Sequence, residues 1–97
     1  MLELSHKVKP DSDVILTELE NKEAVLLHLG TKMYYSLNET GLRIWQMLGG
    51  GLTLGEISKK LQDEFDVTPE KAKESIINLV GELITEKLVE VVEVVDE

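Results

Sequence analysis

The chain has 97 residues, of which 42% are hydrophobic, and this is enough for one small domain with a single core. It has no cysteine, which excludes disulfides, thiolate catalysis and cysteine-ligated metal sites. Its formal net charge of -9 repels nucleic-acid phosphates and anionic lipid head groups, so the composition argues against either as a partner.

The first third of the chain predicts a three-stranded antiparallel sheet. Residues 1–12 are expected to form a loosely held arm that could contain a short extended piece, and strands are expected at 14–19, 24–29 and 32–37. A polar turn joins the first two strands, and Gly30-Thr31 fits a two-residue hairpin between the last two. Tight turns favour a meander whose third strand lies at an edge. In the middle strand, Val25, Leu27 and Leu29 are expected to face the core.

The third strand is expected to run directly into a first helix. Asn38 is a favourable N-cap, and three glycines at 49–51 end the helix. Gly41, Ile44, Trp45 and Leu48 share one helical face. Both tyrosines and the only tryptophan of the chain lie between residues 32 and 48, so this junction is the strongest candidate for a binding site.

Two further helices are clearly signalled. Thr53 and Glu56 form a capping box for a helix that ends near residue 66, and Thr68-Pro69 begins a third helix that runs to about residue 87. The apolar residues of the third helix cover an arc of roughly 160°, wider than a surface helix needs. Either the core uses the whole arc, or one flank of it, Ile77, Val80 and Ile84, borders a groove kept for a ligand. The predicted core contains Trp45, Ile57, Leu61, Phe65, Leu79 and Leu83.

The tail after residue 88 is rich in valine and resembles a strand, with Glu90 and Glu93 interrupting it. It could pair within the domain as a wing, pair between subunits, or fray. We expect one domain over residues 1–97, with its core at 13–89 and the acidic tail at 90–97.

The sequence offers little for catalysis. His6 and His28 have no second ligand at a metal-binding spacing, and the three glycines lack the GK[ST] of a phosphate loop. We therefore predict a protein that is not an enzyme by itself, with no metal and no cofactor. The chain has neither a signal-peptide pattern nor an apolar run of membrane length, so we expect a cytoplasmic protein.

A capped second helix followed by a longer third one is typical of a winged helix-turn-helix arrangement. Many proteins with this arrangement bind DNA, so DNA binding is a candidate function. The third helix contains no arginine, however, and the only arginine of the chain is Arg43. The electrostatics are not those of a DNA-reading helix, and no nucleic-acid partner is expected.

The ordered series of motifs resembles the PqqD-like family, whose namesake acts in pyrroloquinoline quinone biosynthesis. The likeness covers about residues 13–89 and begins with YYSLNETGLRIWQML at the strand–helix junction. It continues through LTLGEI, the FDV break and the long third helix. The matching residues are Tyr35, Leu37, Asn38, Gly41, Ile44, Trp45, Thr53, Glu56, Ile57, Phe65, Asp66, Val67, Leu79, Leu83, Leu88 and Val89. A second tyrosine, Tyr34, and the long acidic tail depart from the pattern.

The resemblance implies an α+β, winged helix-turn-helix-like peptide-binding domain with a three-stranded antiparallel sheet followed by three helices. Such domains hold the leader of a ribosomally made precursor peptide as an added strand and present it to a modifying enzyme, often of the radical S-adenosylmethionine (SAM) type. We expect a monomer or homodimer that partners neither nucleic acid nor membrane. The alternative is an acidic winged-helix adaptor or transcriptional regulator. The predicted peptide-binding residues are Lys32, Met33, Tyr34, Tyr35, Ser36, Lys73, Ile77, Val80, Gly81 and Ile84.

Overall fold

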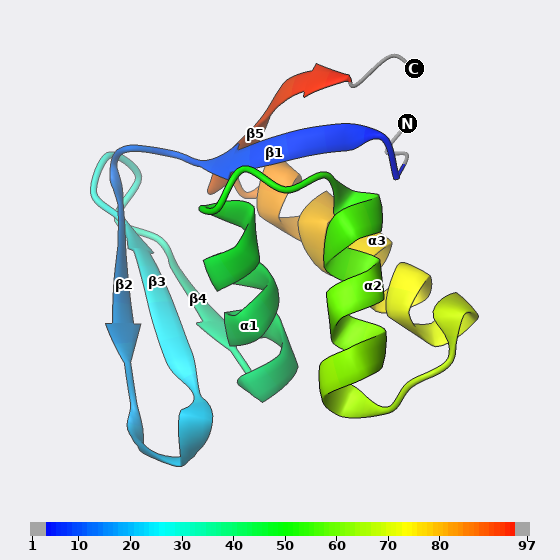
Figure 1. Cartoon of the computed structure of the whole chain (residues 1–97). Coiled ribbons are helices and arrows are strands. Elements are labelled where there is room, and N and C mark those ends of the chain that lie inside the picture. Colours follow the sequence, from blue (N-terminus) through cyan, green and yellow to red (C-terminus); the bar gives the residue numbers. More distant parts are fainter. Residues whose placement is uncertain (1–3, 95–97) are drawn as a thin grey trace.

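A computed structural model describes residues 4–94 of the chain. Within this range it contains two antiparallel sheets and three α-helices, in an α+β arrangement (Figure 1). The elements are β1 (His6–Pro10), β2 (Val14–Glu18), the short 3-10 helix η1 (Glu20–Lys22), β3 (Ala24–His28), β4 (Tyr34–Leu37), α1 (Glu39–Leu48), α2 (Leu54–Phe65), α3 (Pro69–Thr85) and β5 (Val89–Val94). The predicted fold class is confirmed.

The larger sheet has the order β2-β3-β4, as the meander predicted, and β4 runs into α1 after a single residue. The buried face of β3 is, however, the opposite of the predicted one. Ala24, Leu26 and His28 are buried, whereas Val25 and Leu27 are half-buried on the other face and Leu29 is 41% exposed. The prediction was wrong because the sequence AVLLHL is apolar on both faces, so alternation alone could not choose between them.

The connection from β3 to β4 is longer than the predicted two-residue hairpin. The Nδ1 atom of His28 accepts hydrogen bonds from the backbone N–H groups of Gly30 (3.0 Å) and Thr31 (3.2 Å). Lys32 then adopts a left-handed conformation with φ of 63°, and its N–H donates to the His28 carbonyl. The buried histidine thus shapes a wider turn, and β4 begins at Tyr34 rather than at Lys32.

Part of the arm, His6–Pro10, forms a paired strand and is therefore held more firmly than expected. β1 pairs with β5 in antiparallel register from His6↔Val94 to Pro10↔Val89, and Val8 is only 2% exposed. Of the three fates considered for the tail, the structure shows pairing within the chain. The arm gave no signal of this, because Val8 is an isolated apolar residue whose strand partner lies at the other end of the sequence.

The three helices begin at the predicted caps. The Asn38 side chain accepts from the N–H of Gly41, Thr53 and Glu56 form the reciprocal capping box, and Thr68 caps α3. Local hydrogen bonding therefore positions each helix start, as the sequence indicated.

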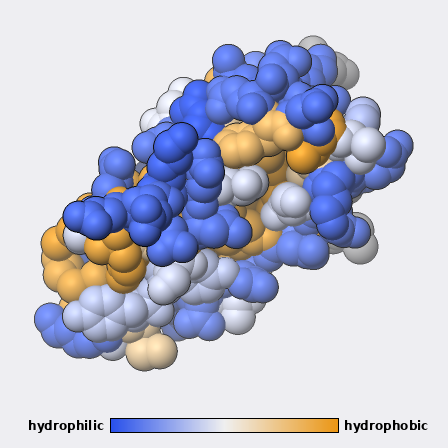
Figure 2. Space-filling model, turned by 90° about the horizontal axis from the view of Figure 1, so that it is seen from below, coloured by the Kyte–Doolittle hydropathy of each residue, from blue (hydrophilic) through white to orange (hydrophobic). Residues whose placement is uncertain are grey.

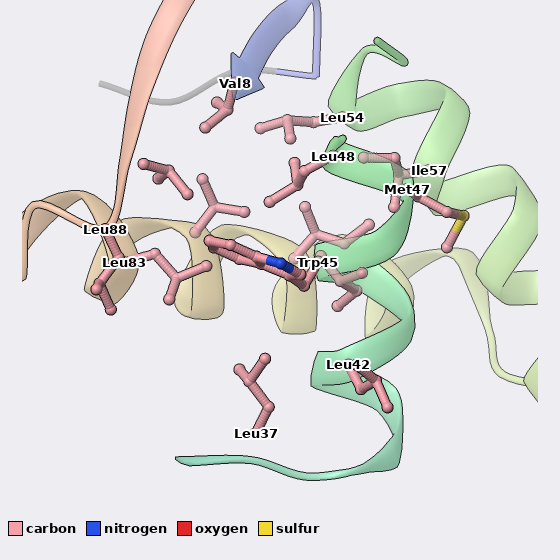
Figure 3. Packing of buried hydrophobic residues seen from close by; sticks show 14 of the residues in the cluster. Val8, Leu37, Leu42, Trp45, Met47, Leu48, Leu54, Ile57, Leu83 and Leu88 are labelled. Atoms are coloured by element: carbon pink, nitrogen blue, oxygen red, sulfur yellow. The ribbon is translucent and has the colours of Figure 1, made fainter. Parts of the chain in front are cut away.

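The core lies where α1, α2 and α3 meet the two sheets. Figure 3 shows the Trp45 ring of α1 lying between α1 and α3, with Val8 of β1 packed near Leu54 of α2. Trp45, Ile57, Leu61 and Leu83 are buried as predicted, but Phe65 and Leu79 are only partly buried at the margin of the core. Leu88 and Val89, next to the tail, are fully part of it.

The surface reflects the charge of the chain. The face shown in Figure 2 is mostly hydrophilic, and hydrophobic residues reach it only as separate patches. No helix within residues 4–94 is long and apolar enough to cross a membrane.

Candidate binding groove

The direction of the backbone N–H and C=O groups in β3 determines which backbone groups of β4 face the open edge of the sheet. The His28 N–H donates toward β4, to the carbonyl of Met33 (3.0 Å), whereas the Leu29 N–H donates toward β2, to the carbonyl of Asp13 (2.8 Å). Successive residues of an antiparallel strand point their backbone groups to opposite sides. The even-numbered residues of β3 therefore bond to β4.

The partners of those residues on β4 are Tyr35 and Leu37. It follows that Tyr34 and Ser36 turn their backbone N–H and C=O groups away from β3, toward the open edge. No strand of the described range lies beyond this edge, since β4 ends the order β2-β3-β4. Four backbone groups are thus available for pairing with another extended segment.

A hollow of about 520 Å³ lies between the side chain of Tyr35 and one face of α3. We call it the β4–α3 groove. A second hollow of about 330 Å³ shares Asn78 and Glu82 with it and continues to the start of α1. The groove is lined by Tyr35, Ile77, Asn78, Gly81, Glu82, Thr85 and Glu86.

Tyr35 connects the strand to the helix across this groove. Its hydroxyl donates a hydrogen bond to Oε1 of Glu82. Partial burial of the phenol, this hydrogen bond and the negative charges of Glu82 and Glu86 together raise the pKa of Tyr35 to about 12. The phenol therefore remains a neutral donor at physiological pH.

Gly81 leaves space in the groove that the protein does not fill. A Cβ atom added at Gly81 would meet no atom within 4 Å. A glycine inside a helix costs about 1 kcal/mol relative to alanine, and no close packing within the described chain requires one here. The missing side chain deepens the groove instead.

The structure brings only some of the predicted peptide-binding residues together. Tyr35, Ile77 and Gly81 line the groove, Tyr34 and Ser36 form its strand edge, and Lys32 and Met33 lie in the turn before β4. The assignment of these residues to peptide binding stays a prediction.

Three predicted residues lie elsewhere. Val80 is completely buried in the core and does not border the groove, so a Val80→Asp change would bury a carboxylate without a partner and disrupt the fold. Ile84 packs against the core and is not among the residues that line the groove. Lys73 lines a different hollow of about 490 Å³, bordered by Leu4 and α2.

Four residues of the groove were missed: Asn78, Glu82, Thr85 and Glu86. They are polar and occupy the exposed side of α3, which a hydrophobic pattern assigns to solvent. A signal was present in the spacing, because Ile77, Gly81 and Thr85 follow one another at intervals of four residues and so form a single stripe.

Within the described residues, no group of three or more His, Cys, Asp or Glu side chains is placed to hold a metal ion. The chemistry of the groove is that of hydrogen bonding, charge and a strand edge. Together the fold and the groove define a small α+β domain with an unpaired edge strand beside a helix.

Comparison with known protein families assigns this domain to one of them. The family model described as coenzyme PQQ synthesis protein D (PqqD) matches residues 23–89. The chain belongs to this family, as its motifs indicated. Its sequence matches none of the curated proteins.

Two solved structures share the fold. One is described as TbiB1 in complex with the TbiA(beta) leader peptide; it is 27% identical, with a TM-score of 0.76, over 91% of this chain and 99% of that one. The other is described as lasso peptide synthetase B1 complexed with the leader peptide. It is 23% identical, with a TM-score of 0.77, over 86% of this chain and 96% of that one.

Proposed function

We propose that this protein binds the leader of a ribosomally made precursor peptide as an extra strand on the edge of β4. In this proposal the outward N–H and C=O groups of Tyr34 and Ser36 pair with the leader backbone. Alternate side chains of the leader enter the β4–α3 groove, over Ile77 and Gly81. Backbone pairing gives affinity that tolerates sequence variation, and the groove selects side chains.

The observation that carries the proposal is the open edge of β4 beside a groove that Gly81 leaves unfilled. Exposed strand edges favour aggregation, and proteins usually protect them. Here the edge is exposed, and a helix residue that costs stability enlarges the space beside it. A peptide strand explains both features. Membership in the PqqD family and the likeness to TbiB1 in its leader complex support the same reading.

We further propose that the protein is a recognition module and not an enzyme by itself. It would hold the leader while a partner enzyme, of the radical SAM type or another peptide-modifying type, acts on the rest of the precursor. Two observations support a role in peptide modification. The family description refers to coenzyme synthesis, and one structural neighbour of this chain is described as a lasso peptide synthetase. The residues that line the groove offer hydrogen bonds, charge and apolar contact to such a peptide.

The test uses a proline at each edge of the sheet. Ser36→Pro removes an outward N–H from β4 without removing a bond to β3, and the proline ring blocks strand addition. Leaders of short precursor peptides encoded near the gene are synthesised and titrated into isotope-labelled protein. Amide shifts are expected at residues 33–36 and 77–86 in the wild type, and Ser36→Pro is expected to abolish binding.

The matched control is Glu18→Pro on β2, the opposite edge of the same sheet. Glu18 pairs with Ala24, whose backbone groups point toward β4, so the Glu18 N–H also points outward. This variant is expected to bind as the wild type does. Binding that survives Ser36→Pro, or shifts confined to α2 and to the β1–β5 pair, would refute strand addition on β4.

A further inference from the structure

The charges that line the β4–α3 groove all have the same sign. Glu82 and Glu86 are its charged residues, and neither lysine nor arginine lines it. Glu82 lies in the last turn of α3 and Glu86 is the C-cap residue of the same helix, so the two glutamates are four positions apart, and both line the groove. Like charges at this spacing are unfavourable for a helix. The helix therefore keeps an unfavourable pair at the groove.

Glu64 and Glu74, which lie on helices outside the groove, have cationic partners. Glu64 accepts two hydrogen bonds from Arg43, at 2.7 Å and 2.9 Å, and Glu74 pairs with Lys71 at 3.3 Å. Glu82 instead accepts from the neutral phenol of Tyr35. Within residues 4–94, neither Glu82 nor Glu86 lies within ion-pair distance of a lysine or arginine.

The carboxylates of Glu82 and Glu86 place negative charge inside the groove. Their negative charges contribute to the raised pKa of Tyr35, whose hydroxyl lies between the strand and the helix. The groove is also partly apolar, because Ile77 and the open position of Gly81 lie beside the two acids. A matching side chain would combine an apolar stem with a positive end.

We propose that the bound peptide carries a lysine or arginine whose stem lies over Ile77 and Gly81 and whose charged end pairs with Glu82 and Glu86. The inference rests on the proposed function and names the class of peptide that the groove accepts. Lysine and arginine can bury their methylene stems while the charge stays at the rim. A strand added to β4 directs every second side chain toward the groove, so one basic residue at an inward position is sufficient.

The experiment selects peptides without assuming a sequence. A displayed library of random linear peptides is selected on the wild-type protein, and only peptides that fail to bind Ser36→Pro are kept. Lysine or arginine is expected to be enriched at one position. For one such peptide, Glu82→Gln with Glu86→Gln is expected to weaken binding roughly threefold to tenfold. Replacing the basic residue of the peptide by glutamine should weaken it similarly, and the combined changes should cost no more than either alone.

Glu74→Gln with Glu70→Gln is the matched control, because it changes the net charge of α3 equally but outside the groove. It is expected to leave affinity almost unchanged. Equal weakening by both pairs of changes would show general charge attraction and overturn the inference. Edge-dependent peptides without an enriched basic residue would overturn it while leaving the proposed function in place. If no selected peptide depends on the β4 edge, the proposed function and the inference fail together.

Discussion

Tyr35 shows how one side chain can belong to both the sheet and the groove. Its backbone pairs with Leu26 of β3, while its hydroxyl reaches Glu82 of α3. The sequence indicated Tyr35 through its place at the strand–helix junction. It did not indicate Glu82, because 47 residues separate the two and only the fold brings them together.

The raised pKa of Tyr35 predicts a loss of stability at high pH. The phenol has a pKa of 10.0 in the unfolded chain and about 12 in the folded protein, mainly because of burial and then of the hydrogen bond to Glu82. Between these values the unfolded chain loses a proton that the folded protein keeps, so stability falls as pH rises. The contribution is complete below pH 10 and is lost as pH passes 12.

Urea denaturation of the wild type and of Tyr35→Phe between pH 9 and pH 12 measures this contribution. The difference in unfolding free energy between the two proteins is expected to shrink as pH rises, since phenylalanine cannot ionise. A difference that stays constant with pH would show that Glu82 and burial do not favour the protonated phenol.

At the scale of elements, the helices were predictable and the strand faces were not. Helix starts are determined by residues three positions apart, such as Thr53 and Glu56, so the sequence contains the whole signal. The buried face of β3 depends on register with β2 and β4, which the sequence does not contain. The strand edge of the groove was predicted from the sequence. Most of the α3 residues that line the groove were not, because they are polar and a hydrophobic pattern assigns them to solvent. Val80 and Gly81 are neighbours in sequence, yet one lies in the core and the other in the groove.

Trp45 of α1 belongs to the hydrophobic core and is 6% exposed. Replacing a buried aromatic residue by alanine removes its burial and leaves a cavity, so Trp45→Ala is expected to cost about 3–5 kcal/mol. Chemical denaturation followed by circular dichroism measures the cost. The exposed neighbour Gln46, changed to alanine, serves as the control and is expected to change stability by less than about 0.5 kcal/mol. A cost for Trp45→Ala below about 1 kcal/mol would contradict the core assignment.

At the scale of the whole molecule, the charge of the protein is unfavourable for binding DNA. The net charge is -9, and Glu82 and Glu86 lie on the groove side at the end of α3, the counterpart of a recognition helix. Affinity for duplex DNA comes largely from lysine and arginine contacts that release counterions. The helices therefore lack the clustered lysine and arginine residues that contacts with DNA phosphates would need.

Negligible binding to duplex DNA is expected even at low salt, where attraction between opposite charges would be strongest. A mobility-shift titration to micromolar protein provides the measurement. A shifted band that disappears steeply with added salt would contradict the prediction, because that salt dependence is characteristic of phosphate contacts.

The pairing of β1 with β5 has a consequence for the order in which the chain can fold. Val8 packs near Leu54 of α2, but its partner across the strand pair is Val91, about eighty residues further along the chain. During synthesis, β1 emerges before the three helices and waits without its strand partner until α3 has been made. The helices need no such delay, because their caps and contacts are close in sequence. The pairing of β5 with β1 is therefore expected to be the last step in the folding of these elements, after the groove has formed.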